Sequence, residues 1–214
     1  MTIAKGRSNT EAELDFLKET LEKMIISVEQ KFKDNLTNLK AEIFDIEHDY
    51  TISKDEQVSL CKSYYDELDD NLSKLQQARN KLVICIYSIC ESILASICKD
   101  YKIKVEYYIG NKKHKDFYLL DYLYSINPDF KKKIKNTEVV SDYIRNLRNH
   151  LTHSGDKNIA NTILKFSNLG YSDISLQQDQ VIIKSPKFLF QILDKCCDLL
   201  TEAESAAKDK CKKS

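Results

Sequence analysis

The chain has 214 residues, enough for one sizeable domain or for a small domain with an extension. Charged residues make up 31% of it, and only four Gly and two Pro interrupt it, which favours long helices and excludes a disordered chain. The net charge is zero, yet residues 11–76 carry 17 acidic and 8 basic residues, so nucleic acid should be attracted only to the rest of the chain.

Two long helices are predicted first. Apolar residues recur every three or four positions from Leu14 to Ile46, which indicates an amphipathic helix close to a coiled-coil seam. After a break at residues 49–52, Ser53 and Glu56 form a capping-box pattern that starts a second helix. Because the connection is short, the two helices should be antiparallel neighbours.

The chain is expected to divide within the second long helix. Residues 1–76 would form an N-terminal helical arm, and residues 77–214 a compact domain that shares this helix. The arm is either a structural extension without a catalytic role, or its long seam holds a partner helix or a second copy of the chain.

The second half of the long helix has a different composition. Residues 82–98 (LVICIYSICESILASIC) are apolar on most sides, which predicts a central core helix. Glu91 is the exception, and a charge in such a helix needs a partner or a polar face. Glu91 therefore either faces a cation inside the fold or occupies a narrow strip exposed to solvent.

A basic and aromatic region follows. Residues 103–109 alternate in polarity and predict a short strand before the turn at Gly110, and residues 117–126 predict a short helix. Lysines beside tyrosines offer phosphate-binding charge and stacking surfaces, although an ordinary solvated loop has the same composition. The candidate RNA-binding residues in this region are Lys112, Lys113, Lys115, Lys131, Lys132 and Lys133.

The densest polar stretch of the chain is at residues 145–155, RNLRNHLTHSG. It ends a predicted helix that begins near residue 137 and buries an apolar stripe. The stripe consists of Val140, Ile144, Leu147 and Leu151. At about 100° per residue, Arg145 and Asn149 lie on the opposite face. Arg148 and His153 flank that face from its two sides.

This stretch resembles the signature of the HEPN superfamily: an Arg, four to six residues and a His, often with Asn directly after the Arg. Arg148, Asn149 and His153 fit it as R-N-x-x-x-H, and the same pattern fits one turn earlier from Arg145 to His150. We prefer the later frame because its His has the small and apolar neighbours that are usual in the family. The alternative is that the arginines form surface ion pairs and His153 caps the helix.

The resemblance covers residues 78–210 and implies an all-α fold. HEPN domains are helical bundles, commonly dimeric, with the two motif helices facing one another. Many are metal-independent endoribonucleases of toxin–antitoxin or anti-phage defence systems, and others are binding modules that have lost the motif. The family often has an acidic or polar residue on the helix packed against the motif helix, so Glu91 is a candidate supporting residue that could orient Arg148 or another motif arginine. Some HEPN toxins carry a Tyr two residues after the His, which a nucleotidyltransferase antitoxin modifies; Gly155 stands there, so this control is not expected.

The motif residues suit RNA cleavage without a cofactor or metal. RNA supplies its own nucleophile, the 2′-hydroxyl, so no Ser or Cys nucleophile is needed, and DNA should resist. We expect Arg148 to stabilise the charge that develops on the phosphate and His153 to transfer the proton. Asn149 would fix the His153 ring or the phosphate, and the supporting residues Arg145 and His150 would bind adjacent phosphates. The product would be a 2′,3′-cyclic phosphate.

The rest of the chain predicts a short helix at residues 159–166, a β hairpin from residues 174–176 and 181–184, and a last helix from residue 185. The C-terminal tail from residue 206 should fray. The expected architecture is therefore a HEPN-like bundle with a long N-terminal antiparallel helical hairpin and a small β hairpin before the last helix.

Seven Cys without a CxxC pair predict reduced thiols in a cytoplasmic protein. Their spacing and that of the four His predict no zinc site. No secretion signal or membrane-spanning helix is expected. The partners expected are RNA, a second copy of the chain and a protein partner or antitoxin bound through the arm. The alternative function is a non-catalytic HEPN-like binding protein or a regulatory subunit of a neighbouring enzyme.

Overall fold

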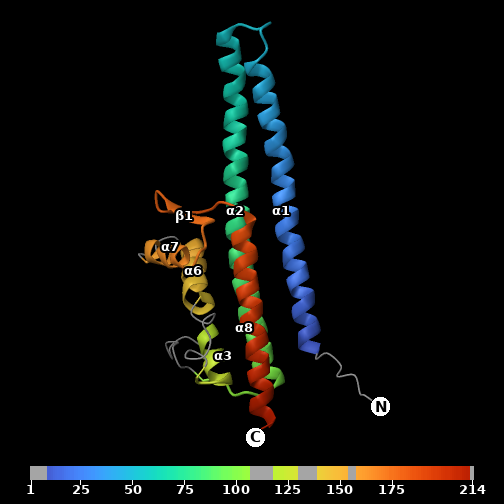
Figure 1. The fold of residues 1–214 in the computed structure, drawn as a ribbon, viewed down its shortest axis with the longest axis vertical. Helices are drawn as coiled ribbons and strands as arrows, with labels where there is room; N and C mark the ends of the chain where they lie inside the picture. Colours follow the sequence, from blue (N-terminus) through green and yellow to red (C-terminus); the bar gives the residue numbers. More distant parts are fainter. Residues whose placement is uncertain (1–8, 107–117, 130–138, 154–157, 213–214) are drawn as a thin grey trace, which may run out of the picture.

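A computed structural model describes residues 9–106, 118–129, 139–153 and 158–212. The described chain is mostly helical, with one small two-stranded antiparallel sheet (Figure 1). This confirms the predicted secondary-structure class.

Two long antiparallel helices form the backbone of the molecule, as predicted (Figure 1). They are α1 (Asn9–Glu47) and α2 (Lys54–Asp100). Ser53 caps α2, because its side chain accepts a hydrogen bond from the backbone N–H of Glu56 at 3.3 Å. This cap satisfies one of the free N–H groups at the start of the helix.

The C-terminal helix α8 (Pro186–Lys212) lies against both long helices in the lower half of Figure 1. Leu21 and Ile25 of α1 share one apolar cluster with the core residues of α8. Lys18 forms an ion pair with Asp194 at 2.7 Å across the same contact. The first part of α1 therefore packs against the bundle.

The second half of α2 is the central core helix. Its residues Ile86, Leu94 and Ile97 are almost completely buried, with α8, α3 and α6 packed around them. By length and composition alone, α2 contains an 18-residue window apolar enough to cross a membrane, and 44% of that window is buried inside the fold. No such segment was expected from the sequence.

A side layer of short elements covers one face of α2 (Figure 1). Its helices are α3 (Leu119–Ile126), the π-helix η1 (Val139–Ile144), α6 (Arg145–His153) and α7 (Ile159–Asn168). η1 continues directly into α6, so the motif helix contains a wide turn that the regular spacing did not predict. Ile144 and Leu147 of the predicted stripe are fully buried, and Leu151 is half-buried.

The predicted β hairpin is present as β1 (Ile174–Gln177) and β2 (Gln180–Ile183). Its two turn residues, Gln178 and Asp179, have φ angles of 47° and 62°. Two central residues with positive φ are typical of the type I′ turn that fits the twist of a two-residue hairpin.

Two sequence expectations are wrong. Residues 103–106, which should have begun a strand, are not in one, and the remainder of that segment lies outside the described residues. The tail from residue 206 does not fray, because α8 continues to Lys212. Ala203 and Ala207 are fully buried there, and Lys210 Nζ donates to the carbonyl oxygen of Ser125 at 2.5 Å. Packing against the bundle therefore orders a segment whose composition alone predicted fraying.

Candidate functional site

Helix α6 packs against α2, and Arg148 lies near enough to α2 for its charge to act on Glu91 of that helix. The Arg148 side chain is half-buried; its Nη1 donates to Asn149 Oδ1 at 3.0 Å. Its Nε atom is enclosed and has no hydrogen-bond partner among the described residues. Thr152 closes the last turn by donating its hydroxyl to the Arg148 carbonyl oxygen at 2.7 Å. Arg148 is therefore held against the core and does not extend freely into solvent.

The structure places Glu91 of α2 near the motif arginines. Burial raises the pKa of Glu91 above its ordinary value, while the charges of Arg148 and Arg145 oppose that rise. Tyr87, one turn earlier on α2, and the backbone of Leu119 also lower the pKa of Glu91. We call Tyr87, Glu91, Arg145 and Arg148 the Glu91 cluster.

Within the Glu91 cluster, the two arginines act on Glu91 through their charge and without an ion-pair contact. No ion pair within 4.0 Å joins Glu91 to either arginine in the part of the chain that the structure describes. Burial and the Glu91 charge both raise the pKa of Tyr87, and Arg145 and Arg148 lower it. The Glu91 carboxylate therefore attracts the guanidinium groups of Arg148 and Arg145, and solvent weakens this attraction because Glu91 is only partly buried.

Arg145 lies one turn before Arg148 and is partly exposed. Its Nη2 atom is 3.7 Å from Asp142 Oδ1, a loose pair between residues three apart. Such exposed pairs contribute little to stability, about 0–1 kcal/mol. Arg145 is therefore the motif arginine that is freer to reorient toward a phosphate.

The two motif histidines occupy different environments. His153 is the last residue of α6 and is exposed, whereas His150 is half-buried with an enclosed, unpaired Nδ1 atom. Five residues turn a helix by about 140°, so neither histidine lies on the same face as the arginine of its own frame. Arg148 and His153 therefore lie on different sides of α6.

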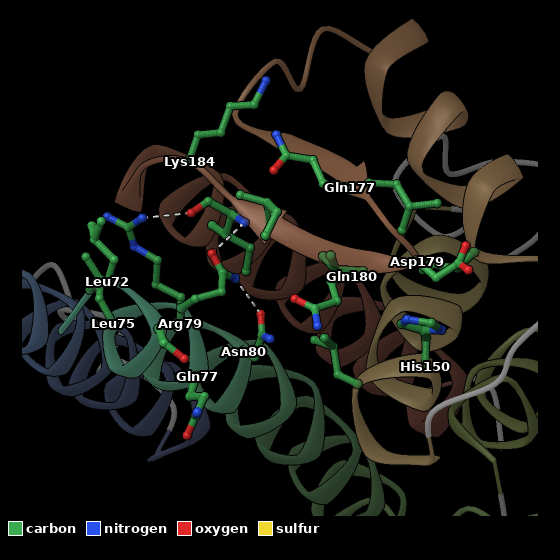
Figure 2. Close-up of a pocket in the computed structure, with 18 of the residues that line it drawn as sticks. Leu72, Leu75, Gln77, Arg79, Asn80, His150, Gln177, Asp179, Gln180 and Lys184 are labelled. Carbon is green, nitrogen blue, oxygen red and sulfur yellow. Dashed lines mark hydrogen bonds between the residues drawn. The ribbon is translucent and has the colours of Figure 1, made fainter. Parts of the chain in front are cut away.

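His150 borders a groove that the sequence analysis did not predict (Figure 2). The groove has a volume of about 1270 Å³ and lies between α2, the β hairpin and the end of α6. One sequence signal was present: Arg79 occupies a position of the α2 stripe between Leu75 and Leu82 that should be apolar. Such an interruption indicates a polar contact with another element.

The candidate RNA-binding lysines lie outside the described residues, so their placement relative to α6 is a prediction. Those residues are Lys112, Lys113, Lys115, Lys131, Lys132 and Lys133. Among the residues described, no group of three or more His, Cys, Asp or Glu lies close enough together to hold a metal ion.

No family model, curated protein or solved structure matches the chain. The resemblance to HEPN proteins therefore rests on the R-N-x-x-x-H pattern and on the helical context of its residues. What the site does has to be argued from its own chemistry.

Proposed function

We propose that the chain is a metal-independent endoribonuclease. The observation that carries this proposal is the R-N-x-x-x-H stretch at the end of a short helix packed on the core, with Glu91 beside its arginines. An arginine beside the core and a histidine at an exposed helix end can supply the positive charge and the proton transfer that phosphate ester cleavage needs.

The proposed reaction needs only RNA and these side chains. The 2′-oxygen attacks the adjacent phosphorus and gives its proton to His153. The bond from phosphorus to the 5′-oxygen breaks, and the 5′-oxygen takes a proton from an acid or from water. Arg148 stabilises the extra negative charge on the phosphate in the transition state. The products are a 2′,3′-cyclic phosphate and a free 5′-hydroxyl.

The separation of Arg148 from His153 favours a site built from two protomers. A second α6 helix facing the first would set the exposed His153 of one protomer opposite the arginines of the other. We therefore propose a homodimer as the active form. Its proposed setting is a cytoplasmic toxin or an anti-phage defence effector, with the arm available to an antitoxin or another partner.

A second candidate function is a non-catalytic binding or regulatory protein. The observation that favours it is the position of Arg148, which is turned toward α2 and hydrogen-bonded to Asn149. An arginine held in this way has a structural use even if no RNA is cut.

The deciding experiment is incubation of the purified chain with a mixed RNA pool in EDTA, followed by mapping of the RNA ends. We expect 2′,3′-cyclic phosphate ends, an undiminished rate in EDTA and no cleavage of DNA of the same sequence. The Arg148→Ala/His153→Ala double variant, prepared in the same way, is the control for a contaminating nuclease. Intact RNA with a protein shown to be dimeric by light scattering would favour the second candidate.

A further inference from the structure

The groove beside α6 is large and borders the motif. Its volume of about 1270 Å³ lies above the range of roughly 300–1,000 Å³ that is usual for small-molecule sites. His150 and Leu151 of α6 form part of its lining. The groove therefore suits a segment of a polymer, and a chain passing over the end of α6 would reach it.

Two side chains of α2 fix the shape of the groove by binding the hairpin (Figure 2). Gln76 accepts a hydrogen bond from the Ile183 N–H at 3.1 Å, and Arg79 donates to the Ile183 carbonyl oxygen at 2.7 Å. Gln76 also donates to Asn80 Oδ1 at 2.9 Å. These bonds orient Asn80 before any ligand arrives, which lowers the entropy cost of binding.

Three polar groups at the groove have no hydrogen-bond partner among the described residues. They are Asn80 Nδ2, the side-chain amide of Gln180 and His150 Nδ1. Figure 2 shows Asn80 on α2 and Gln180 on the hairpin approaching the groove from its two sides. Asn80 and His150 are half-buried, and a half-buried group gains when a ligand supplies the missing partner. Gln180 is exposed and offers both a donor and an acceptor to a ligand.

The groove offers little free positive charge. Arg79 is neutralised by Glu29, to which it donates two hydrogen bonds of 2.6 and 2.7 Å. Lys184 points away from α2 in Figure 2, and Asp179 adds a negative charge. Phosphate groups are therefore poor occupants. The remaining lining is mainly amide and apolar, the latter from Leu72, Leu75, Leu151, Ile159 and Val181.

We propose that this groove is a base-recognition subsite for single-stranded RNA. Nucleobases have apolar faces and hydrogen-bonding edges, and Asn and Gln amides pair well with those edges. Single-stranded RNA presents unstacked bases that proteins read in this way. An added peptide strand fits less well, because Gln76 and Arg79 already occupy the outward N–H and C=O of Ile183 on the edge of β2.

The subsite deepens the proposed function and rests on it. A strand whose phosphate meets the motif arginines would place a neighbouring base in the groove, since the groove-lining His150 is two residues from Arg148 on the same helix. The groove would then select the sequence that is cut, while the Glu91 cluster and His153 act on the phosphate.

The test compares RNA binding by the wild type and by Asn80→Ala/Gln180→Ala. The probes are fluorescent 2′-O-methyl homopolymers of A, C and U, which lack the nucleophile, and the readout is anisotropy. We expect the wild type to prefer one base by about tenfold or more, and the double variant to lose that preference. Asn161→Ala/Gln178→Asn, two exposed amides outside the groove, should keep it. If the double variant does not fold, the single change Gln180→Ala, at an exposed position, replaces it in the test.

The outcomes separate the subsite from the catalytic proposal. Equal binding of all three homopolymers by the wild type, or an unchanged preference in the double variant, overturns the subsite even if the wild type cuts RNA. A preference that the double variant loses, in a protein that leaves natural RNA intact, supports the subsite and overturns the ribonuclease. Failure of the wild type to bind any of the three overturns both.

Discussion

The two sides of α6 differ in how firmly the fold holds them. On one side Arg148 lies against α2, half-buried, within the Glu91 cluster. On the other, His153 ends the helix and is exposed to solvent. The bundle thus positions the arginine, whereas the exposed histidine has no hydrogen bond or ion pair with the described residues.

Because of this difference, substitutions on the two sides of α6 should affect activity and stability differently. A change at His153 should alter the reaction and leave the fold unaffected, because surface substitutions usually change stability by less than about 0.5 kcal/mol. A change in the Glu91 cluster should alter both, because it unbalances partly buried charges.

The largest effect is expected at the exposed side. His153→Ala should slow RNA cleavage on the order of 100- to 10,000-fold, because proton transfer is lost, with an unchanged melting temperature. His150→Ala is the matched comparison and should act mainly by weakening RNA binding. Single-turnover cleavage of labelled RNA and thermal melts measure both. Loss of cleavage in His150→Ala alone would show that the earlier frame, from Arg145 to His150, is catalytic.

On the enclosed side, Arg148→Ala should slow cleavage about 100- to 1000-fold, because the transition state loses its fixed positive charge. Arg148→Lys keeps the charge but not the planar guanidinium and should remain impaired. Arg145→Ala should cost less and appear mainly as weaker binding. The same single-turnover assay, with titration of RNA concentration, distinguishes the cases. If Arg145→Ala lost as much rate as Arg148→Ala, the assignment of Arg148 as the catalytic arginine would be contradicted.

We expect the basic residues Lys112, Lys113 and Lys115 to help bind RNA. Changing Lys112, Lys113 and Lys115 to Glu should weaken binding and reduce the slope of log K against log salt by about 0.7 for each phosphate that is no longer neutralised. Anisotropy titrations at several salt concentrations measure this slope. The control makes the same change at three exposed lysines of α1: Lys31, Lys33 and Lys40. An equal reduction of the salt slope in the control would mean that the overall charge of the chain, and not Lys112, Lys113 and Lys115, is responsible.

The smallest effect concerns the pH dependence of stability on the enclosed side. Burial raises the pKa of Glu91, so its contribution to stability is present below its ordinary value and is lost as pH rises through the raised pKa. Glu91→Gln should therefore melt at a higher temperature than the wild type at neutral pH, with the difference shrinking on acidification.

Glu19 provides a control in which the pKa shift has the opposite sign. A hydrogen bond from Lys23 lowers the pKa of Glu19, which is fully exposed. Glu19→Gln should therefore lose any small stabilising effect at neutral pH and match the wild type in acid. Thermal melts across the pH range measure both variants. A Glu91→Gln variant that melts lower than the wild type at neutral pH would mean that attraction to the arginines outweighs the burial of the carboxylate.

Much of the fold could be predicted because its signals are local. The stripe of α1, the Ser53 cap of α2 and the hairpin are each encoded within a few adjacent residues, and all are present. The buried stripe of the motif helix followed from spacing as well. The π turn at Val139–Ile144 was missed, since a single wide turn leaves no periodic pattern.

By itself, the sequence determined the two long helices, the core half of α2 and a motif helix that buries Leu147 and leaves His153 exposed. Only the tertiary structure decided that Glu91 lies near Arg148 and Arg145, and that a groove opens between α2 and the hairpin. The physical reason is the sequence separation over which each kind of interaction acts. Helix periodicity and caps act over four residues or so, whereas the bond from Arg79 to Ile183 joins residues that are neighbours only after the bundle has packed.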